Sequence, residues 1–287
     1  MAHEHIGKIA KRRAESHKGE YGKVLVIAGS RGMTGAAYLT SQSALRSGSG
    51  LVVCAVPESL NTIMEAKLTE VMTLPLPEGK EHWLTERSVE KILEFSETCD
   101  AVALGPGMGS HESTRRLIRI LVEKLTPPIV LDADGINAFG GDPRALSLRT
   151  GRMVITPHPG EMARLTGHTA VEVQESRIST ARSVAEVTGC TVCLKGHRTV
   201  VSSFDGAIYT NTTGNSGMAT AGTGDVLTGM IASFLGQGLD DFGAAVSAVF
   251  LHGLSGDIAA EKIGPFSLIA GDLIDHLPEA FRKSGIT

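Results

Sequence analysis

Cysteine is scarce in this chain and irregularly placed. The 287 residues include four cysteines: Cys54 and Cys99 stand alone, while Cys190 and Cys193 form one C-x-x-C at the edge of an apolar run. A zinc site needs a second pair or histidines at ligand spacing, and a redox C-x-x-C usually begins a helix rather than entering a strand. We therefore interpret Cys190 and Cys193 as two small core residues of a strand.

An excess of positive charge is also missing. The formal net charge is -4, whereas proteins that bind nucleic acid nonspecifically neutralise its phosphates with clustered Lys and Arg. We therefore expect no nucleic-acid partner. Any polyanionic ligand must be held by a local site.

Two kinds of apolar segment are absent as well. The N-terminal residues carry several basic side chains but no apolar core of a signal peptide, and no apolar run approaches the roughly 18 residues that span a bilayer. We therefore expect no membrane segment and a cytoplasmic protein. Residues 1–20 are expected to form a basic N-terminal extension, followed by a single domain over 21–287.

The composition that remains suits a globular protein with a sizeable core, at 42% hydrophobic and 20% charged residues. Short β-branched runs alternate with longer helical patterns, which is typical of a parallel sheet covered by helices on both faces. The expected strands are 23–28, 51–56, 101–104, 129–132, 153–156 and 191–195. The expected helices between them are 36–47, 113–125 and 171–188.

The segment 199–210 departs from this rhythm. Two strand-like pieces flank Asp205-Gly206, a dipeptide that suits a tight hairpin turn, so an antiparallel edge is expected. Apolar side chains then recur at one-turn spacing from Val226 to Leu235, and a further helix is expected over 241–263. The predicted fold class is α/β: a three-layer sandwich with a mostly parallel central sheet, helices on both faces and an antiparallel edge hairpin.

The strongest local signal is the turn Ala221-Gly222-Thr223-Gly224-Asp225, which runs directly into the apolar helix. Its glycines let backbone N–H groups point inward, and the helix N-terminus adds partial positive charge. The turn therefore predicts an anion hole for a phosphate in transfer. From the sequence alone, Asp225 fits a favourable acidic residue of a first helical turn as well as a catalytic carboxylate.

Polar, glycine-rich loops follow the other expected strands. In an open α/β sheet, loops at the carboxyl ends of the strands form the ligand crevice, so their convergence favours one binding site. With the 221–225 turn, the loops are Gly-Ser-Arg-Gly-Met-Thr-Gly (29–35), Gly-Pro-Gly-Met-Gly (105–109), Asp-Ala-Asp-Gly (132–135), Thr-Pro-His-Pro-Gly-Glu (156–161) and Lys-Gly-His-Arg-Thr (195–199).

The order of these segments resembles the ribokinase superfamily, and specifically the ADP/ATP-dependent NAD(P)H-hydrate dehydratases. The resemblance covers about residues 19–278. Gly-Thr-Gly-Asp alone implies only the superfamily, whereas Thr-Pro-His-Pro-Gly-Glu and Gly-Met-Thr-Gly-Ala-Ala point to the dehydratase branch. The resemblance implies a ribokinase-like fold and ADP-dependent dehydration of (6S)-NAD(P)H hydrate to NAD(P)H, with AMP and phosphate as products.

The resemblance also implies cofactors and partners. It implies Mg²⁺ and ADP, or ATP, as phosphoryl donor, and it makes a homotetramer plausible. Members of this family often carry an epimerase domain ahead of this one, for which this sequence has no room. We therefore expect a functional link to a separate NAD(P)HX epimerase.

Site residues follow from the resemblance by position, and none of them is assigned as a metal ligand. Asp225 is the implied catalytic residue, with Ala221, Gly222, Thr223 and Gly224 as the anion hole. The implied nucleotide-binding residues are Lys195, Gly196, His197, Arg198, Thr199 and Gly224. The implied substrate contacts are Ala37, Gly107, His158 and Asp225.

Several residues keep a second interpretation. His158 alone reads as an ordinary loop histidine, although its flanking prolines stiffen the backbone. Asp132 and Asp134 fit helix caps or turns as well as they fit a place near substrate or magnesium. The residues interpreted as packing are Cys54, Trp83 and His252.

Two other functions share the anion hole. One is a superfamily kinase for a small alcohol such as hydroxyethylthiazole or hydroxymethylpyrimidine, and the other is a non-catalytic adenine-nucleotide sensor. A nicotinamide oxidoreductase is disfavoured because loop 29–35 lacks the spacing of a dinucleotide-binding motif.

Overall fold

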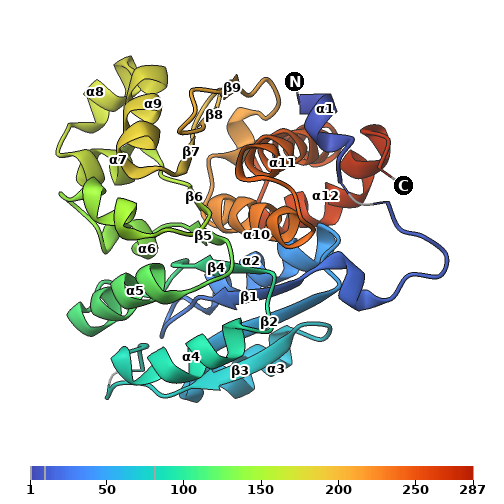
Figure 1. The fold of residues 1–287 in the computed structure, drawn as a ribbon. Coiled ribbons are helices and arrows are strands. Elements are labelled where there is room, and N and C mark those ends of the chain that lie inside the picture. The colour runs from blue at the N-terminus through green and yellow to red at the C-terminus, as the bar shows by residue number, and fades with distance from the viewer. Residues whose placement is uncertain (1, 10, 81, 287) are drawn as a thin grey trace.

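The computed structural model of this chain describes residues 2–9, 11–80 and 82–286. In this part of the chain, nine strands form one sheet in the order β3-β2-β1-β4-β5-β6-β7-β8-β9 (Figure 1). Neighbours are parallel from β3 to β7, and β8 and β9 add an antiparallel edge. The strands are β1 (Lys23–Ile27), β2 (Leu51–Pro57), β3 (Met72–Leu76), β4 (Ala101–Leu104), β5 (Ile129–Leu131), β6 (Met153–Ile155), β7 (Thr191–Leu194), β8 (Val200–Ser202) and β9 (Ile208–Thr210).

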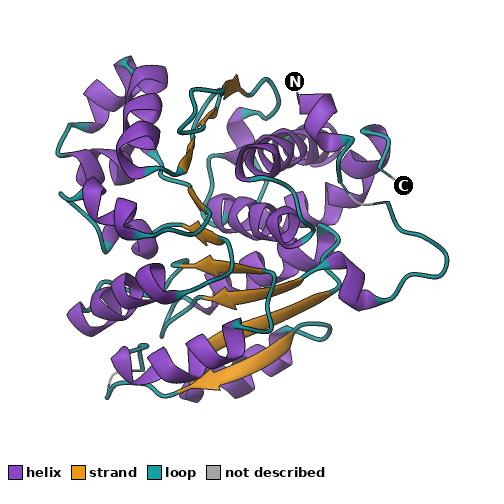
Figure 2. Cartoon of the chain, viewed as in Figure 1, coloured by secondary structure: helices purple, strands orange, loops and turns teal. Residues whose placement is uncertain are grey.

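Helices cover both faces of the sheet, which gives three layers (Figure 2). One face carries α1 (Ala2–Ile6), α2 (Thr34–Arg46), α3 (Asn61–Lys67), α10 (Thr223–Gly236), α11 (Asp241–Ile263) and α12 (Ala270–Lys283). The other carries α4 (Val89–Ser96), α5 (Glu112–Lys124), α6 (Asp134–Asn137), α7 (Pro159–Thr166), α8 (Ala170–Glu175) and α9 (Arg177–Thr188).

Strand β1 explains why the central strands are apolar throughout. Val24 and Val26 point into the core on the α10 side, whereas Leu25 and Ile27 point into the core on the α5 side. Successive side chains of a strand face opposite sides of the sheet, so burying both faces requires an unbroken apolar run. The predicted fold class is confirmed.

The order of the strands reverses between β1 and β4. The chain leaves β1 toward α2 on one face, whereas it leaves β4 toward α5 on the other face. Loops that diverge in this way open a crevice at the carboxyl edge of the sheet. Loops 29–35 and 105–109 lie at this point. They are joined by a hydrogen bond in which the Gly29 amide donates to the Pro106 carbonyl at 2.8 Å.

Several elements differ from the expectation, and the helices α3, α4, α6 and α7 are among those not expected. Strand β3 was not expected: it forms the half-exposed edge of the sheet and contains Pro75, which an edge strand tolerates. Helix α12 was not expected either. The single helix expected over 171–188 is two helices, α8 and α9, because the backbone at Ser176 leaves the helical region with φ -127° and ψ 37°.

The N-terminal residues are not detached from the fold. Helix α1 packs on α11, where Ile6 is buried and the His5 ring meets the Phe242 ring edge-on at 5.6 Å. The division of the chain at residue 20 stays a prediction.

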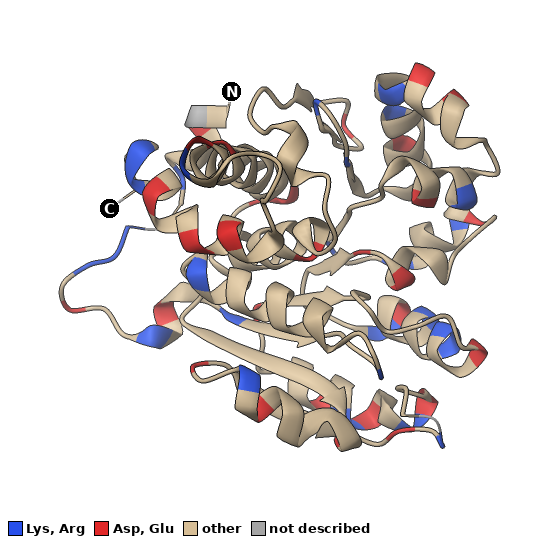
Figure 3. Cartoon of the chain, turned by 180° about the vertical axis from the view of Figure 1, so that it is seen from behind, with Lys and Arg blue, Asp and Glu red and all other residues tan. Residues whose placement is uncertain are grey.

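Seen from behind, Lys, Arg, Asp and Glu are mixed along the outer helices rather than gathered in one region (Figure 3).

Helix α11 is long and apolar enough to cross a membrane by length and composition, although the expectation from the sequence considered only unbroken apolar runs. A search for unbroken apolar runs misses it because its apolar residues alternate with Gly, Ser and Ala. Most of the helix is buried inside the protein, where it packs against α10 and α12. Core helices of globular proteins pass the same test of composition.

Helix α10 owes its position to a close approach by α2. A Cβ added at Gly229 would lie 2.1 Å from both the Thr40 carbonyl oxygen and the Ser43 hydroxyl oxygen, so the two backbones touch at this glycine. The contact fixes the helix that begins at the 221–225 turn. Packing this tight leaves no room for a methyl group.

We expect Gly229→Ala to lower the free energy of unfolding by about 2 kcal/mol, because α2 and α10 must separate. Gly271→Ala in α12 is the matched control: its Cβ would meet nothing within 4 Å, so the gain in helix propensity should leave stability equal or higher by up to about 1 kcal/mol. Urea unfolding of both variants measures the difference. Equal effects of the two substitutions would contradict the close approach.

Candidate active site

The 221–225 turn lies at the surface end of α10. Ala221 is exposed and residues 222–225 are half-buried. Gly222 adopts φ 91°, and a Cβ there would lie 2.5 Å from Leu39 Cδ1, so both conformation and space require glycine. The first N–H groups of a helix have no partner within the helix, and they point out of its N-terminal end. The turn therefore presents free amides to the surface.

Beside the turn lies a hollow of about 490 Å³. One wall is formed by the segment that leads into the turn and the other by the loop between α11 and α12. Its lining residues are Ser216, Gly217, Ala219, Thr220, Pro265, Phe266 and Leu268. The lining thus includes Thr220, the residue next to the turn in the chain, and the hollow is large enough for part of a small ligand.

Asp225 stands in the first turn of α10 with a free carboxylate. Among the described residues, none donates a hydrogen bond to it, so it does not cap its own helix. Burial and the nearby Asp132 carboxylate raise the pKa of Asp225 to about 7, although Lys195 opposes both effects. A carboxylate with a pKa near neutrality suits a general base.

Lys195 connects three elements behind the turn. Its Nζ lies 2.5 Å from Asp132 Oδ1 at the end of β5, and Asp132 Oδ2 accepts a 2.7 Å hydrogen bond from the Thr228 hydroxyl of α10. A Cβ at Gly224 would come within 3.3 Å of Lys195 Nζ, so glycine lets the ammonium group approach the turn. Burial opposes the charge of Lys195, but Asp132 and Glu161 outweigh it and raise the pKa of the ammonium group.

His158 caps α7. Its Nδ1 accepts the amides of Gly160 and Glu161 at 3.0 and 3.4 Å, and the Glu161 carboxylate accepts the His158 amide at 2.8 Å. The ring is half-exposed, and its Nε2 lies 3.4 Å from Glu161 Oε1. The capping box fixes the ring at the carboxyl edge of the sheet and turns the second Glu161 oxygen toward Lys195 at 3.8 Å.

Two of the remaining implied substrate contacts come from the loops after β1 and β4. Gly107 is half-buried, and a Cβ there would lie 2.9 Å from Ala36 Cβ. Ala37 is fully buried beneath Gly29, so a ligand reaches it only if this loop moves. The roles implied for both residues stay predictions.

The segment 195–199 forms a surface loop at the end of β7. Gly196, His197 and Arg198 are exposed and Thr199 is half-buried, with positive φ at Gly196 and Arg198. Arg177 of α9 holds the start of the loop, because its Nη2 donates to the Leu194 and Lys195 carbonyls at 2.8 and 3.2 Å. Lys195 thus points inward to the turn, while the next three residues face solvent.

The structure gives different contacts to Asp132 and Asp134, whose roles the sequence left open. Asp132 is buried and pairs with Lys195. Asp134 accepts the Gly109 amide at 2.7 Å and so ties loop 105–109 to the start of α6. The residues interpreted as packing are buried or stacked: Cys54 and His252 are buried, and Trp83 stacks on His111 at 3.9 Å.

Two site residues were missed in the sequence. Thr228 follows Asp225 by three positions and therefore lies on the same face of α10, a spacing that could have identified it. Glu161 was quoted as part of a motif, but its contact with Lys195 depends on the fold. No sequence signal links Glu161 to a lysine 34 positions further along the chain.

The side chains do not form a metal site by themselves. In the described ranges, no group of three or more His, Cys, Asp or Glu is arranged to hold a metal ion. Mg²⁺ is usually bound through substrate phosphates and water with only one or two carboxylates. The residues present therefore fit a magnesium ion that is held mainly by a nucleotide.

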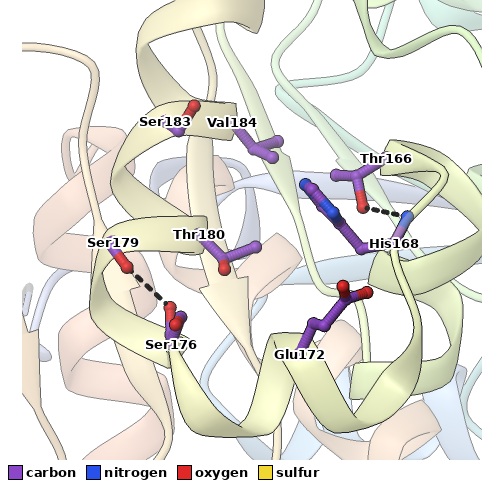
Figure 4. A pocket seen from close by; sticks show the side chains of 8 residues that line it. All are labelled: Thr166, His168, Glu172, Ser176, Ser179, Thr180, Ser183 and Val184. Carbon is purple, nitrogen blue, oxygen red and sulfur yellow. Dashed lines mark hydrogen bonds between the residues drawn. The ribbon is translucent and has the colours of Figure 1, made fainter.

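A second hollow, of about 330 Å³, lies between α7, α8 and α9 (Figure 4). Several of its polar groups already bond within their own helices: the Ser179 hydroxyl donates to the Ser176 carbonyl, and Glu172 accepts the Thr169 amide and hydroxyl. Its lining residues come from α7, α8, α9 and the residues between them, whereas the hollow of about 490 Å³ is lined by residues of the segment that leads directly into the turn. We therefore place the candidate site at the turn.

Comparison with known proteins identifies the family. A sequence profile of the NAD(P)H-hydrate dehydratase family matches residues 24–279. The chain belongs to this family. The resemblance drawn from the sequence motifs is therefore confirmed, and so is the ribokinase-like fold.

Curated dehydratase relatives are similar over nearly the whole chain. The bifunctional NAD(P)H-hydrate repair enzyme of Moorella thermoacetica is 45% identical over 276 residues, which cover 96% of this chain and 52% of that protein. The ADP-dependent (S)-NAD(P)H-hydrate dehydratase of Neisseria meningitidis is 38% identical, over 92% of this chain and 87% of that one. The chain thus spans about half the length of the bifunctional relatives it matches.

A solved dehydratase structure has the same fold over the full length. The ADP/ATP-dependent NAD(P)H-hydrate dehydratase of Bacillus subtilis, co-crystallised with ATP and Mg²⁺, matches with a TM-score of 0.86 and 33% identity. The match covers 99% of this chain and 97% of that one.

The raised pKa of Asp225 predicts a pH-dependent stability. The folded carboxyl has a pKa of about 7, above the value near 4 in an unfolded chain, so the native protein loses stability as the pH rises through this interval. Asp225→Asn does not titrate. We expect the variant to exceed the parent in free energy of unfolding by about 2 kcal/mol above pH 8, with the difference shrinking toward pH 4.

Urea unfolding at a series of pH values tests this expectation. Asp142→Asn is the matched control, because Asp142 is an exposed cap outside the site. A difference that stays constant with pH would show that the Asp225 pKa is ordinary.

Proposed function

We propose that this chain catalyses the ADP-dependent dehydration of (6S)-NAD(P)H hydrate to NAD(P)H, with AMP and phosphate as products. The observation that carries the proposal is the free carboxylate of Asp225, with a pKa near 7, at the amide-lined end of α10 and beside the paired Lys195. The names of the relatives support the same substrate class. We assign Asp225 the catalytic role.

The chemical problem is a poor leaving group. Hydrated NAD(P)H carries a hydroxyl next to the ring nitrogen, and phosphorylation makes that oxygen a good leaving group. Asp225 accepts the hydroxyl proton while the oxygen attacks the terminal phosphoryl group of ADP and the bond to AMP breaks. The nitrogen lone pair then expels phosphate, and loss of a proton from the neighbouring ring carbon restores the dihydronicotinamide.

The turn and Lys195 handle the charge of this transfer. Amides of Ala221, Gly222, Thr223 and Gly224 line the end of α10, where they stabilise negative charge on the phosphoryl oxygens. The Lys195 ammonium group reaches the same place through the gap at Gly224. Asp132 and Glu161 keep Lys195 charged despite its burial.

The nucleotide and the hydrated cofactor approach Asp225 from different loops. We assign the nucleotide to Lys195 and the following loop, Gly196, His197, Arg198 and Thr199, with the hollow beside the turn as further space. Gly107, His158 and, after loop movement, Ala37 contact the hydrated cofactor. Mg²⁺ bound with the nucleotide would neutralise phosphate charge.

The wider setting is part of the same proposal. The bifunctional names of the longer relatives support a functional link to a second repair activity, which we assign to an NAD(P)HX epimerase. We further propose a cytoplasmic homotetramer in which residues 1–20 form an extension of a domain over 21–287.

The direct test mixes the purified protein with hydrated NADH, magnesium and either ADP or ATP, and follows recovery of the reduced-ring absorbance with release of phosphate. We expect turnover with ADP. Asp225→Asn should lower kcat by at least about 10³-fold, because the base is lost, while ADP affinity changes by less than about threefold. Asp142→Asn, outside the site, should retain parental activity.

Two results would overturn the proposal. A stable phosphorylated alcohol from a vitamin precursor, without recovery of the absorbance, would identify a small-molecule kinase. Nucleotide binding with no turnover of any of these compounds would identify a nucleotide sensor.

A further inference from the structure

His252 lies directly behind the catalytic turn. The residue belongs to α11 and is buried, and its Nε2 lies 2.9 Å from the carbonyl oxygen of Thr223. Its interpretation as a packing residue is therefore incomplete. It is a polar contact from another helix to the backbone of the turn.

The contact determines the state of the ring. A carbonyl oxygen can only accept a hydrogen bond, so Nε2 carries the proton. Burial and the charge of Lys195 lower the pKa of His252 to about 4, although the bond to Thr223 opposes this shift. Near neutral pH the ring is thus an uncharged donor, which adds no positive charge beside Lys195.

The bonded carbonyl belongs to the same peptide unit as the Gly224 amide. In a trans peptide the C=O and N–H groups point in opposite directions, and the described residues contain no cis peptide. A ring that holds the Thr223 oxygen on the α11 side therefore aims the Gly224 N–H away from α11, out of the N-terminal end of α10. A hydrogen bond at the carbonyl also polarises the unit and strengthens its N–H as a donor.

The turn needs such restraint because glycines flank Thr223 on both sides. Gly222 and Gly224 have no side chains to anchor them, and glycine backbones have more freedom than those of other residues. The Thr223 hydroxyl ties the turn to the Met218 and Thr220 carbonyls, both at 3.1 Å. His252 supplies the hold from the opposite helix.

We propose that His252 is a positioning residue for the phosphoryl transfer: its Nε2–H fixes and polarises the Thr223–Gly224 peptide, so that the Gly224 amide is aimed at the transferring phosphoryl group. The inference rests on the proposed function for its kinetic consequence. His252 touches neither nucleotide nor substrate and acts through the backbone of the turn.

The kinetic test compares two substitutions at this position. His252→Leu removes the donor at similar volume, and we expect kcat to fall about 10- to 100-fold with the KM for ADP changed by less than about threefold, because the amide matters most in the transition state. His252→Gln places an amide donor at a similar reach and should recover most of the loss. A structural role alone would lower stability without this split between kcat and KM.

The matched control removes another buried hydrogen bond of the same helix. The Ser255 hydroxyl donates to the His252 carbonyl at 2.8 Å and does not contact the turn. Ser255→Ala should lose stability but keep kcat within about twofold. The proposal is overturned if His252→Leu keeps kcat within twofold of the parent, or if His252→Gln is no better than His252→Leu.

A second measurement is independent of turnover. In protein labelled with ¹⁵N-histidine, the ring signals missing from His252→Leu identify His252, and they should show a neutral Nε2–H ring at every pH above about 5. An Nδ1–H ring, or protonation near pH 6.5, would overturn the inference. This spectrum needs no substrate. Absence of dehydratase activity would therefore count against the proposed function, whereas the spectrum would still show whether His252 donates its hydrogen bond.

Discussion

The ion pair between Lys195 and Asp132 is the interaction on which the rest of the site depends. Burial works against the charge of the Lys195 ammonium group, and removal of one partner from a buried pair typically costs about 3–5 kcal/mol. Asp132 also binds Thr228, so one carboxylate joins the ends of β5 and β7 to helix α10. These three segments, which lie far apart in the sequence, are thereby held together at the site by one carboxylate.

The same ion pair gives the carboxylates of Asp132 and Asp225 different surroundings. Asp132 receives the lysine and a hydroxyl donor, and so its negative charge is satisfied. Asp225 receives no donor and feels the charge of Asp132. The unpaired carboxylate of Asp225 is therefore the one available to exchange a proton.

The sequence was sufficient where one segment determines its own structure. Fully apolar strands such as β1 and β4 were recognisable because both faces are buried, and the glycine turn was recognisable because its backbone must approach other groups closely. Strand β3 was missed because an edge strand needs no continuous apolar run and this one contains Pro75. The break at Ser176 was missed because helical periodicity continues across it.

The sequence was insufficient where a side chain acquires its role from a distant partner. Asp132 could be a cap or a site residue until the fold brought Lys195 to it, and His252 reads as one more residue of an apolar helix until α11 is placed against the turn. These contacts span 63 and 29 positions. Spacing rules describe neighbours within an element and carry no information about such pairs.

The reversal of strand order between β1 and β4 has an evolutionary consequence. The groups assigned to phosphoryl transfer come from α10 and the ends of β5 and β7, whereas the loops that follow β1 and β4 form the side of the site assigned to the acceptor. Mutations in these two loops can therefore alter which alcohol is accepted without disturbing the charged groups behind the turn. One scaffold can thus diversify its acceptors while it inherits its phosphate chemistry intact.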